Sequence, residues 1–220
     1  MATIPLPPYS ESQVASVAGS LPDSREALLA HAKASMQAFD TGIMVGDEQA
    51  AQAAQVNYAA AIWYLNNRTF FGCRGGPDAP GYQVERHCAA EPGKAPRWGQ
   101  QGEFLVSVGG MRVLVKTRDD TYAGMARFEL HAIEGDRPFL TATGYRSALV
   151  PIQAGTTPEQ AAAAFIGGML AEEGQVMIEA EYRARAHRLA AVHWVRSEVA
   201  NLVAGQAIGE EEDGQLTWFL

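Results

Sequence analysis

The chain has few cysteines: only Cys73 and Cys88 occur in its 220 residues. A structural zinc site needs four ligands, usually supplied by closely spaced pairs of cysteine and histidine. His87 stands directly before Cys88, but adjacent residues rarely reach one tetrahedral ion without strain, and no second pair completes the set. The sequence therefore predicts no bound metal.

Motifs for catalysis and phosphate binding are also lacking. The stretch FGCRGGP does not end in the Gly-Lys-Ser/Thr of a phosphate-binding loop, and no strand leads into GxGxxG. No GxSxG sequence marks a nucleophilic serine. These absences predict no cofactor and argue against an enzyme.

Two alternatives to a non-enzymatic protein stay open. In the first, a thiol is activated by an imidazole, with Cys73 or Cys88 as the nucleophile and His87 or His131 as the base. In the second, the chain binds a small molecule in a pocket near residues 68–101.

Long apolar runs and an excess of positive charge are missing as well. No run is long enough to span a bilayer, and the start, MATIPLPPYSESQ, has no basic or apolar export region. These features predict a cytoplasmic protein that does not bind membranes. Seventeen Lys and Arg face 25 Asp and Glu, so the formal net charge is −8. Because a phosphate backbone repels such a chain, we do not expect direct nucleic-acid binding.

What the sequence does contain is a clear strand pattern over residues 102–152. Apolar and polar residues alternate on both sides of Gly109–Gly110, a pair typical of a tight hairpin turn. Further strand-like runs at 126–133 and 139–152 follow after short connections, which favour antiparallel pairing. We predict an α+β fold built on a roughly four-stranded antiparallel β-meander.

Helical spacing flanks this sheet on both sides. Ser10, a capping residue, predicts a short N-terminal helix at about 11–18, and helical spacing and alanine-rich sequence predict two more at about 24–39 and 47–67. On the C-terminal side, a capping threonine and a proline predict a helix that starts near residue 157 and stops at Gly174. A second C-terminal helix is expected to run unbroken over 175–203.

The most economical organisation is a single domain over residues 1–220, because four strands alone leave an apolar face uncovered. Its expected parts are a helical part (1–67), a Gly/Pro/Arg/aromatic loop (68–101), the sheet (102–152), the C-terminal helices (156–204) and an acidic tail with an apolar terminus (205–220).

The 68–101 segment is the candidate working loop, because long loops in small domains are often functional. It interleaves basic and aromatic residues, and Gly144 interrupts a strand in a way that would re-aim its neighbours. Tyrosine, tryptophan and arginine are enriched at protein interfaces. The predicted binding residues are Arg74, Tyr82, Arg86, Arg97, Trp98, Tyr145 and Arg146.

Together these features predict a non-enzymatic binding or inhibitory accessory protein that acts through a protein–protein surface. Its acidic ends suggest that it would occupy a basic groove on a partner that handles nucleic acid. A homodimer formed through the helix at 175–203 is a further alternative.

Overall fold

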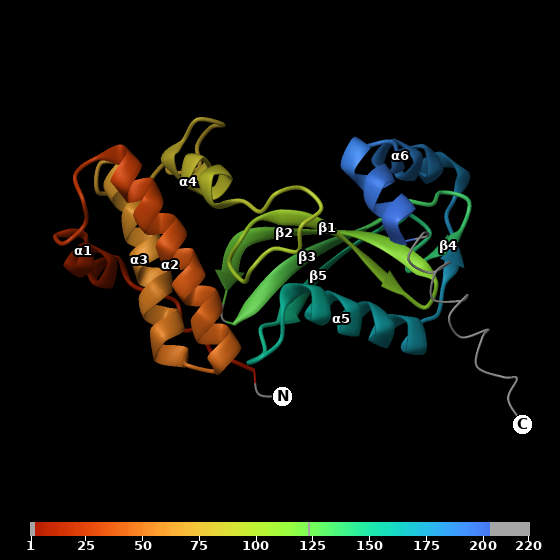
Figure 1. Cartoon of the computed structure of the whole chain (residues 1–220), viewed down its shortest axis with the longest axis horizontal. Coiled ribbons are helices and arrows are strands. Elements are labelled where there is room, and N and C mark those ends of the chain that lie inside the picture. The colour runs from red at the N-terminus through yellow and green to blue at the C-terminus, as the bar shows by residue number, and fades with distance from the viewer. Residues whose placement is uncertain (1–2, 123, 203–220) are drawn as a thin grey trace, which may run out of the picture.

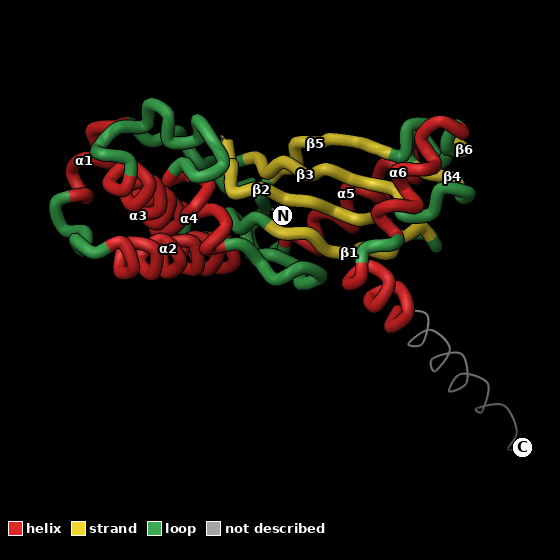
Figure 2. The backbone as a smooth tube through the Cα atoms, turned by 90° about the horizontal axis from the view of Figure 1, so that it is seen from above, coloured by secondary structure: helices red, strands yellow, loops and turns green. Residues whose placement is uncertain are grey.

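The computed structural model describes residues 3–122 and 124–202 (Figure 1). The predicted acidic tail at 205–220 lies outside these residues. Helices α1 to α4 gather at one end of an elongated molecule, and the sheet extends away from them (Figures 1 and 2). The structure thus confirms the predicted α+β class.

The helical end contains four helices in chain order. They are α1 (Glu11–Ala18), α2 (Arg25–Val45), α3 (Glu48–Leu65) and α4 (Pro80–Cys88). The first three were expected, although α2 continues beyond its predicted end. The fourth lies inside the segment that the sequence analysis treated as a loop.

Each of the first three helices starts at a side chain that caps its backbone amides. Ser10, Ser24 and Asp47 each accept a hydrogen bond from the backbone N–H three residues later. Gly46 ends α2 in the left-handed conformation, with φ 76°, so that α3 returns antiparallel to α2. The two helices pack closely at Gly42, where an added Cβ would lie 2.8 Å from a backbone nitrogen of α3.

The sheet has the strand order β1-β2-β3-β5 and is antiparallel throughout. Its strands are β1 (Gly102–Val108), β2 (Met111–Tyr122), β3 (Met125–Ala132) and β5 (Tyr145–Pro151). Gly109–Gly110 forms the predicted hairpin turn, with φ values of 58° and 75°. The fourth strand follows Gly144 rather than beginning at residue 139.

The predicted unbroken helix over 175–203 is wrong. Val176–Met177 forms strand β6, which pairs with β4 (Pro138–Phe139) in a small second sheet. Helix α6 then spans Ala180–Ala190, and residues 193–202 are helical again. The pairing of β4 with β6 joins segments distant in sequence, so the local helical spacing could not reveal it.

Helices cover both faces of the sheet. Helix α5 (Pro158–Glu172) lies along the inner face, whereas α6 lies over the opposite, outer face at the end far from α1–α4 (Figure 1). Phe104 and Phe128 of the inner face pack in one core with Phe39 and Ile43 of α2. The main core therefore runs from the sheet into the helical end.

Trp98 lies inside this core and is only 1% exposed. Its ring stacks on Phe128, with centroids 6.3 Å apart, and its Nε1–H donates to the Thr156 carbonyl at 2.6 Å. Its backbone N–H donates to Asp40 Oδ1 of α2 at 3.0 Å. Trp98 thus fastens the segment after α4 to both the sheet and the helices.

The N-terminal segment makes a second connection between the two ends of the molecule. Its Ile4 N–H donates to the Ile152 carbonyl at 3.0 Å, and Thr3 forms a β-bridge with Gln153. Among the described helices, none is both long and apolar enough to cross a membrane.

Candidate functional site

The predicted site residues fall into separate places in the structure. Arg74, Tyr82 and Arg86 lie on or beside α4, together with Cys73, His87 and Cys88. The rings of Tyr145 and His131 lie 5.0 Å apart, tilted by 42°, at the other end of the sheet beneath α6. Trp98 is in the core. Arg97 is exposed in the segment that joins α4 to β1, and Arg146 on β5 approaches Glu173 at 3.9 Å.

Helix α4 is held against α2 and α3 by one face and presents charge on the other. Pro80 begins the helix, where a missing N–H costs nothing. Val84 and Cys88 are buried in a cluster with residues of α2 and α3. Arg86 and His87 are exposed in the last turn, where a cation is favoured by the helix dipole.

Two arginines tie the segment before α4 to that helix. Arg74 lies 3.5 Å from the buried Glu85 carboxylate and 5.7 Å from the Tyr82 ring centroid. Arg86 Nη1 donates to the Pro77 carbonyl at 2.7 Å. The loop and the helix therefore form one ordered unit.

Other cations lie on the neighbouring elements of the helical end. Arg25, at the start of α2, donates from Nη2 to Gln83 Oε1 of α4 at 2.5 Å. Arg68, just after α3, lies over the Tyr64 ring at 5.6 Å. Lys33 is exposed on α2, about two turns beyond Arg25.

We call this the α4 surface. It comprises Arg25, Lys33, Arg68, Arg74, Arg86 and His87. Apart from Arg74, none of its arginines or lysines forms an ion pair with a carboxylate of the described residues. Their charges are therefore available to an anionic partner.

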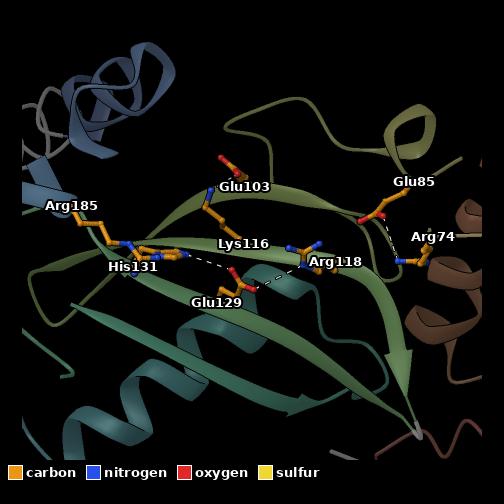
Figure 3. Close-up of polar contacts among 8 residues, drawn as sticks. All are labelled: Arg74, Glu85, Glu103, Lys116, Arg118, Glu129, His131 and Arg185. Carbon is orange, nitrogen blue, oxygen red and sulfur yellow. Dashed lines mark hydrogen bonds and ion pairs between the residues drawn. The ribbon is translucent and has the colours of Figure 1, made fainter. Parts of the chain in front are cut away.

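A second polar cluster crosses the outer face of the sheet (Figure 3). His131 on β3 is buried, and its Nδ1 lies 3.1 Å from Arg185 Nη2 of α6. A guanidinium only donates, so Nδ1 accepts and the ring proton sits on Nε2. That atom is 3.8 Å from Glu129, which in turn lies 4.0 Å from Arg118.

Burial is the main reason that the pKa of His131 falls to about 4, and the positive charges of Arg185 and Lys116 lower it further. The imidazole is therefore neutral near pH 7. The cluster lines a cavity of about 270 Å³. Lys116 pairs with Glu103 beside this cavity, and Arg118 approaches Glu129, so cations and carboxylates nearly balance there.

The proposed pairing of a thiol with an imidazole has no support in this arrangement. Cys73 and Cys88 pack between α4 and the other helices, whereas the ring of His131 contacts Arg185 and Tyr145. His87 is exposed on α4. Within the part of the chain that the structure describes, no three Cys, His, Asp or Glu residues are grouped to hold a metal ion.

Sequence reasoning missed Arg25 because it stands alone in helical sequence, and it did not choose Arg68, the first residue of the predicted loop, as a binding residue. Only the packing of α4 against the start of α2 brings Arg25 beside Gln83. The glycine- and proline-rich composition of 68–101 also hid α4 itself. Its Val84 and Cys88, four residues apart on one helical face, were the available signal.

Family models match both ends of the molecule. Residues 13–87 match the family model described as KlcB N-terminal DNA-binding domain, and residues 101–189 match the one described as KlcB third domain. The first match covers α2 to α4 and most of α1, and the second covers the sheet, α5 and most of α6.

Two curated relatives from Escherichia coli, each named Protein KlcB, are similar to the chain. One is 45% identical over 168 residues, which are 75% of this chain and 42% of the relative. The other is 41% identical over 162 residues, which are 73% of this chain and 35% of the relative. The chain thus spans less than half the length of these relatives. No solved structure matches it.

These matches correct two of the expectations drawn from the sequence. A DNA-binding family model over 13–87 contradicts a main role at a protein–protein surface, and it contradicts the exclusion of direct nucleic-acid contact. The error came from averaging charge over the whole chain. The net −8 hides a surface on which cations without carboxylate partners gather around α4.

Proposed function

We propose that the chain binds DNA through the α4 surface. The observation that carries this proposal is the position of that surface. All six of its residues lie within the range 13–87 that matches a DNA-binding family model, and several of its cations lie on or against α4. Phosphate contacts from arginine and lysine dominate the affinity of proteins for DNA.

Some acidic residues of the helical end lie beside this surface, such as Asp23 and Glu26, which flank Arg25 in the sequence, but a second group lies far from it. Asp40, Asp47 and Glu48 cluster where α2 turns into α3. Arg25 and Asp40 are separated along α2 by about 22 Å, given a rise of about 1.5 Å per residue. This distance exceeds the Debye length of about 8 Å at physiological salt, so the two charge groups act almost independently.

The arrangement of the surface favours a duplex over a small anion. Arg25, Arg68 and Arg86 belong to three different elements and are each held by a contact within the protein. Cations fixed on separate elements suit the spaced phosphates of a duplex backbone. Because phosphate contacts carry no sequence information, they would set orientation rather than specificity.

The proposal is tested by measuring the fluorescence anisotropy of a labelled duplex of mixed sequence at low salt. Replacing Arg25 and Arg86 together by glutamine should weaken binding at least tenfold, since charged contacts to phosphate are lost. Arg188→Gln is the matched control, because Arg188 is an equally exposed arginine in the last turn of α6.

The wild-type protein should bind, the double variant should bind poorly, and the control should bind like wild type. Failure of the wild-type protein to bind duplex DNA at low salt would refute the proposal. Equal losses in the double variant and the control would show that the α4 surface is not the site. The proposed DNA binding belongs to this chain alone and requires no other part of the longer relatives.

A further inference from the structure

Phe71 is an exposed aromatic residue beside the α4 surface. Its side chain is 92% exposed, whereas the neighbouring Phe70 packs inward toward Tyr9, with ring centroids 6.4 Å apart. Aromatic rings are usually buried because water solvates them poorly. An isolated ring that is held in solvent therefore calls for an explanation.

The loop around Phe71 is fixed by hydrogen bonds from side chains. The Asn66 amide donates from Nδ2 to the Thr69 carbonyl at 2.7 Å and to the Phe71 carbonyl at 3.0 Å. The Phe71 N–H donates to Thr69 Oγ1 at 3.1 Å. The exposed ring thus stands on an ordered turn, and little conformational entropy remains to be lost on binding.

The backbone just before this turn is strained. Asn67 and Arg68 are consecutive non-glycine residues in the left-handed region, with φ values of 55° and 61°. Such conformations persist where the surrounding structure enforces them, and they cluster at ligand-binding sites. Here these two residues follow the end of α3, where the Arg68 N–H donates back to the Trp63 carbonyl at 2.8 Å.

The surroundings of Phe71 fit DNA better than a protein partner. Between residues 66 and 79 it is the only large apolar side chain that is strongly exposed, so it is not part of an apolar patch. Protein interfaces bury broad patches of many residues. Instead, Arg68 and Arg74 stand three residues to either side. An apolar ring between cations is typical of side chains that enter between bases while arginines hold phosphates.

We propose that Phe71 inserts between the bases of the bound DNA and acts as a wedge that favours unstacked steps. This inference rests on the proposed DNA binding and adds the mode of contact. It predicts that the protein prefers a duplex with a central mismatch to the fully paired duplex, since a mismatched step costs less to unstack.

The test compares these two duplexes, each about three helical turns long, with the wild-type protein and three variants. Phe71→Ala removes the ring, and Phe71→Trp keeps an aromatic ring at the same place. Val45→Ala is the control, because Val45 is another exposed apolar residue, 72% accessible, at the opposite end of α2. Thermal melting of each variant verifies that it folds.

The wild-type protein, Phe71→Trp and Val45→Ala should prefer the mismatched duplex. Phe71→Ala should lose this preference. It should bind the mismatched duplex about tenfold more weakly than the wild-type protein does, as expected for one lost base stack. A 2-aminopurine placed beside the central step should brighten on binding of wild type, because it becomes unstacked, and not on binding of Phe71→Ala.

The proposed insertion of Phe71 is refuted if Phe71→Ala binds both duplexes with the affinities of the wild-type protein. It is equally overturned if Phe71→Ala weakens both by the same factor with no change at 2-aminopurine, since the ring would then only touch the backbone. Absence of wild-type binding to either duplex would instead refute the proposed DNA binding. The two failures are therefore distinguishable.

Discussion

The dependence of DNA binding on salt is the sharpest prediction from the α4 surface. Each cation that neutralises a phosphate releases counterions, so the slope of log affinity against log salt is about −0.9 per contact. Four cations of this surface lack carboxylate partners among the described residues: Arg25, Lys33, Arg68 and Arg86. If each contacts one phosphate, the slope is about −3.6.

This slope gives a measurable effect over a convenient range. Raising the salt from about 50 to about 200 mM should weaken binding about 150-fold. In Arg86→Gln one contact is lost, so the slope should shrink to about −2.7 and the weakening over the same range to about 40-fold. Fluorescence anisotropy titrations at four or more salt concentrations measure both values.

Arg188→Gln again serves as the control, and its slope should equal that of wild type. A wild-type slope smaller in magnitude than about 1 would mean that phosphates are not the main contacts, which contradicts the reasoning. A slope that Arg86→Gln and Arg188→Gln change equally would refute the assignment of the contacts to α4.

The remaining predictions concern stability, each measured as the free energy of unfolding in urea. Trp98→Ala should lower it by about 3–5 kcal/mol, because a buried ring and its hydrogen bond are lost. As the pH is lowered from 6.5 to about 4, the free energy of unfolding should decrease by about 3 kcal/mol, because His131 binds a proton in the unfolded state before it does so in the folded state. His131→Leu should abolish this decrease. Gly42→Ala should destabilise by about 1–3 kcal/mol through overlap with α3. Gly168→Ala, in open space on α5, should stabilise by about 0.5–1 kcal/mol. Stability that is independent of pH, or stabilisation by Gly42→Ala together with destabilisation by Gly168→Ala, would contradict these estimates.

The sheet could be predicted because its signals are local. Gly109–Gly110 supplies the two positive φ values of a hairpin turn, and the alternation on either side fixes which residues face inward. The helix at 11–18 was likewise predicted by its cap. Residues 176–177 were assigned wrongly because their strand exists only through pairing with Pro138–Phe139.

The candidate site was only partly predictable, for two physical reasons. Composition does not report exposure: Trp98 was predicted as a binding residue and is buried, while Phe71 was not among the predicted binding residues and is 92% exposed. Net charge does not report distribution, because helix packing decides which charges become neighbours. Arg74, Tyr82 and Arg86 were nevertheless chosen as binding residues, and they lie together at α4.

The connection between the helices and the sheet has a consequence for how bound molecules would be arranged. The segment after α4 is anchored through Trp98 to Asp40, and the N-terminal segment through Ile4 to Ile152. Because these two contacts hold the sheet against the helices, a molecule seated on a duplex would point its sheet in one direction from the helix axis. Two molecules separated by whole turns of about 10.5 base pairs would then project their sheets on the same side, and a half-turn offset would place them on opposite sides.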